Sequence, residues 1–205
     1  MLIKLKYDEL NIDKTFSNKI HEIRNKENCD IVMSIHDDDV NLINSLILAA
    51  RPKIIVETGT NVGLSTLVLA YHDFVEKVIT HDLPEGDNIG RSVEFKNTGI
   101  AFRNALFENK IEKRFVRTTD LTELPVADFY FFDSGHTYNV ISHEFQLAEK
   151  AIKNNNKSPL FFVFHDYNLD RFPDVGNFVN NLSKNMDNIF YGIDTKCGIA
   201  YVQMK

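Results

Sequence analysis

The sequence predicts an α/β fold, in which helices cover a mostly parallel sheet. Two observations support this prediction: apolar runs suited to buried strands alternate along the chain with amphipathic helical patterns, and residues 129–132 and 160–164 are apolar without interruption. Uninterrupted apolar runs are typical of strands that are buried on both faces. With 205 residues and 43% hydrophobic content, the chain is long enough for one domain with a full core.

The first 36 residues are mostly polar, with only Phe16, Ile20 and Ile23 at helical spacing. We expect residues 1–36 to form either a helical arm or lid, or a helix packed beside the sheet. Residues 37–205 are expected to form the core of the single domain.

The core begins with a helix whose apolar stripe runs from Val40 to Ala50. Asp37 and Asp38 are expected to cap its N-terminus, and Pro52 is expected to stop it just before the first strand. Strands are predicted at residues 54–57, 78–80, 113–117, 129–132, 160–164, 189–193 and 198–202. The later helices are predicted around residues 64–71, 141–152 and 175–182.

The first strand leads into a turn with the pattern E-x-G-x-x-x-G-x-S, from Glu57 to Ser65, and a helix follows. Gly59 and Gly63 would let a ligand approach the backbone, and the start of the helix presents unpaired N–H groups and a partial positive charge. A dinucleotide-binding turn has the different pattern G-x-G-x-x-G, and the Glu57 carboxylate would repel a pyrophosphate. The alternative is that Glu57 only caps the turn. The residues expected to contact the ligand here are Glu57, Gly59, Thr60, Asn61, Gly63 and Ser65.

An acid also ends the second strand, at Asp82. In open α/β sheets an acid at this position usually binds a ribose diol, although it also often just solvates a turn. Leu83 is a second candidate contact, and Asp120, after the third strand, could contact adenine or cap a helix. A ligand with an amine, a ribose and a base but no phosphate fits these residues, which indicates S-adenosylmethionine (SAM).

Two further acids follow strands: Asp133 comes directly after residues 129–132, and Asp166 comes after residues 160–164 with one residue between. If these strands are neighbours, two carboxylates about 5 Å apart would repel each other by roughly 3 kcal/mol at an effective dielectric of about 20. Either one carboxyl group is protonated or a divalent cation lies between them, and oxygen ligands favour Mg²⁺, Ca²⁺ or Mn²⁺ over zinc. His136 is the candidate general base, with a merely hydrogen-bonding histidine as the alternative.

These motifs together resemble those of the class I SAM-dependent methyltransferases. The closest likeness is to the branch with metal-dependent sugar and macrolide O-methyltransferases, of the methyltransferase domain 24 type. The resemblance covers roughly residues 40–205 and rests on the glycine turn and on residues 81–85, 132–138 and 164–167. One departure is the connection at residues 153–159, where such proteins usually carry a Pro-Gly-Gly turn.

The resemblance implies a Rossmann-like sheet of seven strands, mostly parallel with an antiparallel last strand, and helices on both faces. It also implies that Asp133 and Asp166 hold Mg²⁺, that His136 is the base, and that Asp133 takes part in catalysis and in cofactor binding. The expected activity is metal-assisted O-methylation of a small molecule, such as a sugar or glycan precursor.

Three alternatives stay open at this point. A non-catalytic SAM-binding or scaffold protein could use the same fold, because fold does not fix function. A metal-independent methyltransferase would bind SAM without responding to EDTA. A nucleotide-dependent oxidoreductase would use a similar sheet, but it should show the tighter three-glycine turn.

Composition argues against several partners. The net charge of −6 and the pI of about 5.6 disfavour a nucleic-acid substrate, because affinity for nucleic acids depends on clustered Lys and Arg. The sequence has no apolar run near the ~20 residues of a membrane span and no secretory signal, so we expect a cytoplasmic protein without a membrane partner. Cys29 and Cys197 have no metal-site spacing in the sequence. A homo-oligomer in which a neighbouring arm closes the cleft is left open.

Overall fold

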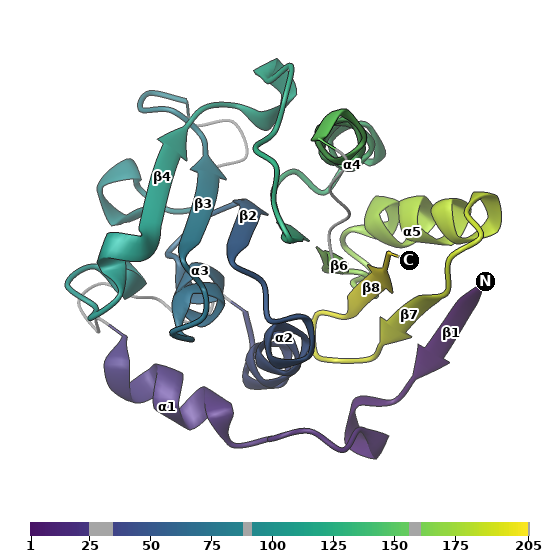
Figure 1. Cartoon of the computed structure of the whole chain (residues 1–205), viewed down its shortest axis with the longest axis horizontal. Coiled ribbons are helices and arrows are strands. Elements are labelled where there is room, and N and C mark those ends of the chain that lie inside the picture. Colours follow the sequence, from purple (N-terminus) through teal and green to yellow (C-terminus); the bar gives the residue numbers. More distant parts are fainter. Residues whose placement is uncertain (25–34, 88–91, 156–160, 205) are drawn as a thin grey trace.

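One sheet of eight strands organises the computed structural model, which describes residues 1–24, 35–87, 92–155 and 161–204. Figure 1 shows how the labelled strands and helices are arranged. The strands are β1 Leu2–Leu5, β2 Ile54–Thr58, β3 Lys77–Asp82, β4 Ile111–Phe115, β5 Phe129–Phe132, β6 Phe161–His165, β7 Phe190–Ile193 and β8 Ile199–Gln203. Their order across the sheet is β1-β7-β8-β6-β5-β2-β3-β4. Strand β8 is antiparallel to both of its neighbours, and all the other pairs in this sheet are parallel.

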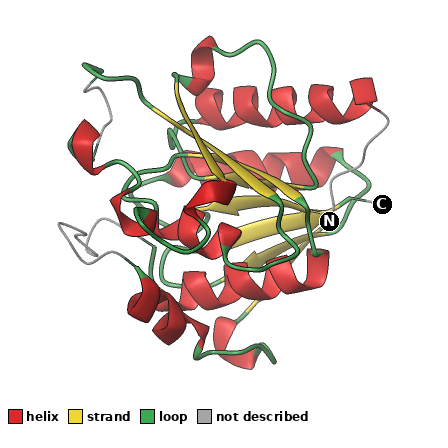
Figure 2. Ribbon diagram, turned by 60° about the vertical axis from the view of Figure 1, so that its left-hand side comes forward, coloured by secondary structure: helices red, strands yellow, loops and turns green. Residues whose placement is uncertain are grey.

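Helices cover both faces of the sheet (Figure 2). The helices are α1 Phe16–Ile23, α2 Asp37–Ala50, α3 Leu64–Ala70, α4 Tyr138–Asn155 and α5 Pro173–Asn185. Short 3-10 helices in the connections are η1 Tyr7–Glu9, η3 Phe95–Asn97, η4 Ile100–Phe102, η5 Glu108–Lys110 and η6 Thr118–Asp120. Within the described ranges, none of the helices combines the length and the apolar character that a membrane crossing requires.

The core is divided by the sheet into two apolar clusters. Successive side chains of a strand point to opposite faces, so Ile55 packs with α1, α2 and α3 whereas Val56 packs with α4 and α5. Phe131 and Tyr130 are divided between the two clusters in the same way. This burial on both faces explains the uninterrupted apolar runs, and it confirms the predicted α/β fold with an antiparallel last strand and helices on both faces.

The N-terminal residues add a strand that the sequence did not predict. Strand β1 pairs in parallel with β7 at the edge of the sheet, with Leu2 opposite Phe190. This strand has only four residues and lies at the edge of the sheet. Its sequence shows no apolar pattern that distinguishes it from the polar residues around it, so its pairing could not be predicted. Helix α1 buries Phe16 and Ile20 beside α2. A lid function for residues 1–36 stays a prediction, and residues 25–34 lie outside the described parts of the chain.

Some predicted boundaries were wrong. Helix α2 has His36 at its N-cap, so Asp37 and Asp38 lie in its first turn, where carboxylates are favoured by the helix dipole. The third core strand was predicted at residues 113–117 but lies at Ile111–Phe115. This strand begins and ends where it pairs with β3, from Ile111 opposite Val78 to Phe115 opposite Asp82. Residues 156–160 lie outside the described residues. They include residues 156–159 of the connection that lacks the Pro-Gly-Gly turn, and residue 160, the first of the strand predicted at 160–164.

Candidate functional site

The site lies where the order of the strands reverses. Strands β3 and β4 lie on one side of β2, whereas β5 and β6 lie on the other side. In an open α/β sheet, such a switch point leaves a crevice beyond the carboxyl ends of the strands, and ligands bind there. The turn after β2 and the residues that follow β5 and β6 all lie at this edge.

The turn after β2 is held against the end of β5. Gly59 has φ +94°, and a Cβ atom at this residue would lie 2.0 Å from the backbone oxygen of Asp133. Gly63 has φ +87°, and its Cβ would lie 2.5 Å from the Phe102 ring. The Thr60 hydroxyl lies 2.6 Å from that of Thr80 on β3. Contact with the Asp133 backbone therefore requires glycine at residue 59, whether or not a ligand is bound.

Glu57 is buried beneath this turn. Its two carboxylate oxygens accept hydrogen bonds from Ser65 Oγ at 2.6 Å and from Thr66 Oγ1 at 2.5 Å. Burial raises the pKa of Glu57 to about 7, although the two hydroxyls act to lower it. In this arrangement Glu57 ties the end of β2 to the first turn of α3. Direct ligand contact by Glu57 or Ser65 stays a prediction.

Asp82 joins the turn to the end of β3. Its Oδ2 accepts a hydrogen bond from the Asn61 N–H at 2.7 Å, and its Oδ1 accepts one from the Leu83 N–H, also at 2.7 Å. The structure therefore brings together Gly59, Asn61 and Asp82, which the sequence predicted as cofactor contacts. Asp120 ends η6 with an exposed side chain, and its contact with adenine stays a prediction.

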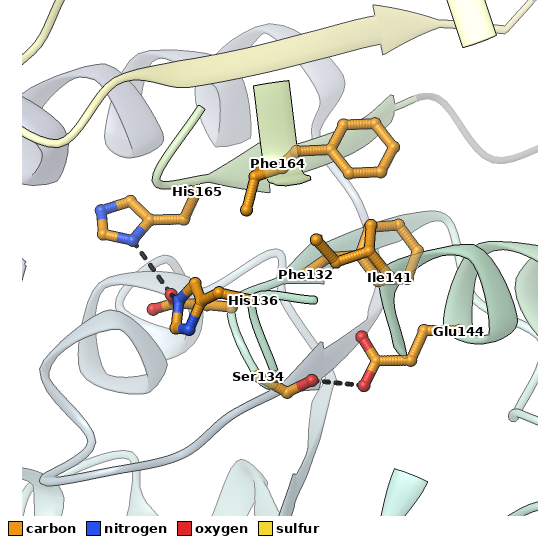
Figure 3. Close-up of a pocket in the computed structure, with 10 residues that line it drawn as sticks. Phe132, Ser134, His136, Ile141, Glu144, Phe164 and His165 are labelled. Atoms are coloured by element: carbon orange, nitrogen blue, oxygen red, sulfur yellow. Dashed lines mark hydrogen bonds and ion pairs between the residues drawn. The ribbon is translucent and has the colours of Figure 1, made fainter. Parts of the chain in front are cut away.

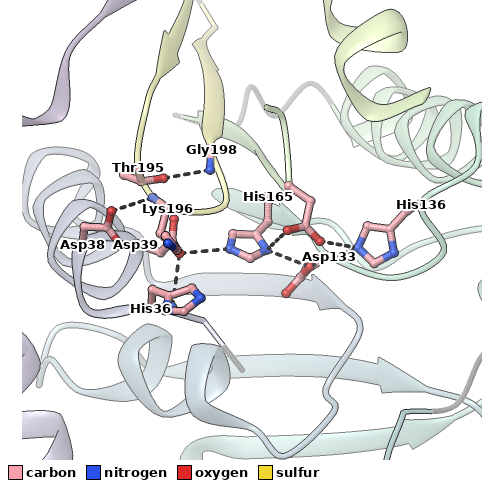
Figure 4. A network of polar contacts seen from close by, with 10 residues as sticks. His36, Asp38, Asp39, Asp133, His136, His165, Thr195, Lys196 and Gly198 are labelled. Atoms are coloured by element: carbon pink, nitrogen blue, oxygen red, sulfur yellow. Dashed lines mark hydrogen bonds and ion pairs between the residues drawn. The ribbon is translucent and has the colours of Figure 1, made fainter. Parts of the chain in front are cut away.

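The acids after β5 and β6 converge, because these strands are neighbours. Figure 4 shows Asp133 between His165 and His136. His136 Nε2 lies 2.7 Å from Asp166 Oδ2 and 3.6 Å from Asp133 Oδ1. Asp166 has φ +59°, an uncommon backbone conformation for a residue other than glycine. Such strain is kept only where the surroundings enforce it, and it is most frequent at functional sites. Asp133, His136 and Asp166 thus form one group, as the sequence predicted for neighbouring strands.

The charged forms of Asp133 and His136 stabilise each other. Burial alone would lower the pKa of His136, but hydrogen bonds and charge from Asp133 and Asp166 raise it to about 9. Burial would raise the pKa of Asp133, but His165 and His136 lower it to about 2. The imidazole of His136 also stacks on Phe172, with ring centroids 3.8 Å apart and an interplanar angle of 10°. Without a bound cation, His136 is therefore a protonated, well-oriented side chain between two carboxylates.

His165 has a larger part in the site than the sequence indicated. Its Nδ1 lies 3.0 Å from Asp133 Oδ1, and its Nε2 faces Asp39 on α2. Although burial acts to lower the pKa of His165, the charge of Asp133 and its hydrogen bond to the imidazole raise it well above its ordinary value. Asp133, His165 and Asp166 each offer one ligand atom, and these atoms lie within 4.8 Å of one another. A divalent cation could therefore bind the two carboxylates, with His165 hydrogen-bonded to Asp133.

Glu144 on α4 was missed by the sequence analysis. Its buried carboxylate accepts hydrogen bonds from the hydroxyls of Thr58 at 2.9 Å and of Thr118. It also accepts one from the Ser134 hydroxyl (Figure 3). Burial raises the pKa of Glu144, and the three hydroxyls partly offset that rise. The three donors lie at or after the ends of β2, β4 and β5, so one carboxylate ties together the ends of three strands at the crevice. The only sequence signal was an acid beside Ile141 and Phe145 on the apolar face of this helix.

The comparisons with known proteins agree with this fold. No family model and no curated protein matches the sequence. Among solved structures, the O-methyltransferase from Bacillus cereus in complex with SAH has a TM-score of 0.63 and 16% identity, and the alignment covers 96% of this chain and 94% of that one. The O-methyltransferase TomG from Streptomyces achromogenes, involved in tomaymycin synthesis and in complex with SAM, has a TM-score of 0.64 and 15% identity, with 97% and 94% covered.

A third structure, the SAH-bound methyltransferase PaMTH1 from Podospora anserina, has a TM-score of 0.64 and 12% identity, and covers 94% of this chain and 88% of that one. At such identities the likeness establishes the fold. The chain therefore has the Rossmann-like fold of these methyltransferases. Its sheet has one strand more than the seven that the sequence predicted.

A first prediction concerns the contact between Gly59 and Asp133. Gly59→Ala places a methyl group against the Asp133 carbonyl, and we expect it to lower the free energy of unfolding by clearly more than the ~1–2 kcal/mol that a left-handed conformation costs. Gly86→Ala is the matched control, because Gly86 has φ +83° but a Cβ atom there would meet nothing within 4 Å. Urea unfolding measures both variants. Equal losses would show that the Asp133 contact does not constrain the turn.

A second prediction concerns pH in the presence of EDTA. Because the folded pKa of His136 is raised to about 9, its stabilisation is complete below its ordinary value of 6.5 and is lost as the pH rises through about 9. Because the folded pKa of Asp133 is lowered to about 2, its stabilisation is complete above 3.8 and is lost as the pH falls towards 2. We expect the temperature of thermal unfolding to be highest between pH 3.8 and pH 6.5, where both contributions are complete. His136→Gln should reduce the fall in this temperature at alkaline pH. A decline of the same size in that variant would contradict the assignment.

Proposed function

We propose that this chain is a SAM-dependent O-methyltransferase that acts on a hydroxyl group of a small molecule with the help of a divalent cation. One observation carries the proposal: Asp133, His136 and Asp166 form a single group at the switch point, directly beside the glycine turn. A ligand in the crevice would meet both features at once. The likeness in fold to methyltransferases that bind SAM or SAH supports the same conclusion.

SAM would lie over the turn between β2 and α3. The positive φ angles of Gly59, Asn61 and Gly63 turn the backbone sharply there, and Asp82 anchors the Asn61 N–H. Asp82 and Leu83 would bind the ribose, and Asp133 would contact the cofactor from the other side of the turn. Glu57, Thr60, Ser65 and Asp120 complete the proposed cofactor set.

The acids fit a divalent cation. Asp166 Oδ1 is buried without a hydrogen-bond partner among the described residues, which is costly unless a positive group approaches it. Carboxylate oxygens favour Mg²⁺ or Mn²⁺. His165 Nδ1 lies 3.0 Å from Asp133 Oδ1, where a hydrogen bond can hold this carboxylate in place. Such a cation would bind the acceptor hydroxyl and lower its pKa. Asp133 and Asp166 are therefore the proposed metal ligands, with Mg²⁺ as the expected ion.

His136 would take the proton of the acceptor hydroxyl. The Phe172 ring lies parallel to the imidazole and restricts its plane, and Asp166 Oδ2, 2.7 Å from Nε2, orients this nitrogen. When a bound cation offsets the negative charges of Asp133 and Asp166, these carboxylates no longer raise the pKa of His136. A histidine with a pKa near neutral can act as a general base. The surrounding residues would also hold the hydroxyl in line with the methyl group, which lowers the barrier by orientation.

A sugar or glycan precursor is the proposed acceptor, and a cytoplasmic, membrane-free enzyme is the proposed setting. The acidic net charge of −6 is compatible with a neutral hydroxyl acceptor and disfavours a polyphosphate such as a nucleic acid. We also propose that copies of the chain associate through residues 1–36. Binding of SAM by the native chain with no transfer to any hydroxyl in a broad acceptor panel would instead favour the non-catalytic alternative.

A third prediction tests the metal ligands. Asp166→Asn removes one of the two carboxylates, and we expect it to weaken Mn²⁺ binding at least about 100-fold, by analogy with the 10–100-fold losses that follow changes around metal ligands. Asp170→Asn is the matched control, because Asp170 is an exposed acid a few residues further along. Titration with Mn²⁺, followed by the electron spin resonance of the free ion, measures both. Unchanged Mn²⁺ affinity in Asp166→Asn would refute this placement, and SAM calorimetry on the same samples would show whether cofactor binding survives.

A further inference from the structure

A second group of potential metal ligands lies behind the proposed methyl-transfer site. Asp39 comes from the first turn of α2, His165 from the end of β6, and Cys197 from the connection between β7 and β8. Each offers one ligand atom, and these three atoms lie within 4.8 Å of one another. The residues are only 0%, 5% and 6% exposed, respectively. The proposed function uses neither Asp39 nor Cys197.

The hydrogen bonds of His165 define which ring nitrogen faces this group (Figure 4). The 3.0 Å contact with Asp133 Oδ1 engages Nδ1, because a carboxylate oxygen accepts a hydrogen bond from a ring N–H. The other nitrogen, Nε2, faces Asp39 Oδ2 at 3.6 Å. That distance is longer than a hydrogen bond.

Two atoms of the group are unsatisfied. Among the described residues, neither His165 Nε2 nor Asp39 Oδ1 has a hydrogen-bond partner, and both are buried. A buried nitrogen lone pair that faces a carboxylate is unfavourable unless a positive charge lies between them. Either a second proton on the imidazole or a metal ion can supply that charge.

We propose that Asp39, His165 Nε2 and Cys197 Sγ bind a zinc-type divalent metal ion. Zinc bonds of about 2.0–2.1 Å to nitrogen and about 2.0–2.2 Å to oxygen would place two ligand atoms of a tetrahedral ion about 3.4 Å apart. The observed separation of 3.6 Å between Nε2 and Oδ2 is close to this value. Thiolate, imidazole and carboxylate together favour zinc over Mg²⁺ or Ca²⁺. Water would fill the fourth position.

The surroundings of His165 match those of a metal-bound histidine. Such a histidine usually donates its other ring N–H to a carboxylate, which fixes its tautomer and orientation. Here Asp133 is that carboxylate. The ion would crosslink α2, β6 and the β7–β8 connection, and it would hold the His165 ring that positions Asp133. This zinc site is distinct from the cation proposed at Asp133 and Asp166, and it does not depend on methyl transfer.

Cobalt substitution of the full chain tests the proposal. We expect the purified protein to retain about one zinc ion per chain after dialysis, as measured by elemental analysis. Replacement by Co²⁺ should produce a thiolate-to-cobalt charge-transfer absorption. Cys197→Ser should abolish this absorption and reduce retained zinc to background. Cys29→Ser, which changes the other cysteine of the sequence, should preserve both signals.

Asp166→Asn separates this site from the catalytic one, because it should lose Mn²⁺ binding and keep the cobalt–thiolate absorption. If Cys197→Ser does not fold, X-ray absorption at the zinc edge of the native protein reports whether one sulfur and a histidine bind the ion. Absence of both retained zinc and the thiolate absorption in the native chain would overturn the proposal and leave an imidazolium–carboxylate pair. An absorption that survives Cys197→Ser, or that disappears in Cys29→Ser, would overturn it as well.

Discussion

The close approach of two backbone segments at the switch point is the constraint on which the site depends. The Asp133 carbonyl occupies the space that any side chain at residue 59 would need, and the Asp133 N–H donates a hydrogen bond to the Thr58 oxygen at 2.9 Å. The turn that would cradle a cofactor and the acid that would hold a cation are therefore positioned by the same backbone contact. A displacement of one segment moves the other, so the two halves of the proposed chemistry cannot shift independently.

Buried carboxylates surround this contact and hold it in place. Glu57 secures the start of α3, and Glu144 secures the ends of β2, β4 and β5, in each case through hydroxyl groups. Burying an acid is unfavourable unless hydrogen bonds compensate it, and such a network favours one arrangement of the loops over others. The polar residues closest to the crevice thus act mainly as a scaffold. Among the described residues, unsatisfied buried atoms lie at Asp39, His165 and Asp166, where a positively charged ligand would be most stabilising.

The sequence could predict those parts of the site that follow strand ends. Asp133 and Asp166 each come after strongly apolar strands, so the sequence predicted their proximity on the condition that these strands are neighbours. The structure meets this condition. Asp39, Glu144 and Cys197 could not be found in this way, because their roles arise from contacts between elements far apart in the sequence. Helical periodicity shows which residues share a face of one helix, but it does not show what that face meets. The same limit applies to β1, whose only partner in the described part of the sheet is a strand near the other end of the chain.

The central claim is that the turn between β2 and α3 binds a sulfonium nucleoside next to a divalent cation. A crystal structure determined after soaking with SAM and Mg²⁺ tests this claim most directly. We expect density for SAM over Gly59, with its ribose at Asp82, and for an ion bound by Asp133 and Asp166. An empty turn at saturating SAM, or NAD bound in its place after a competitive soak, would contradict the account.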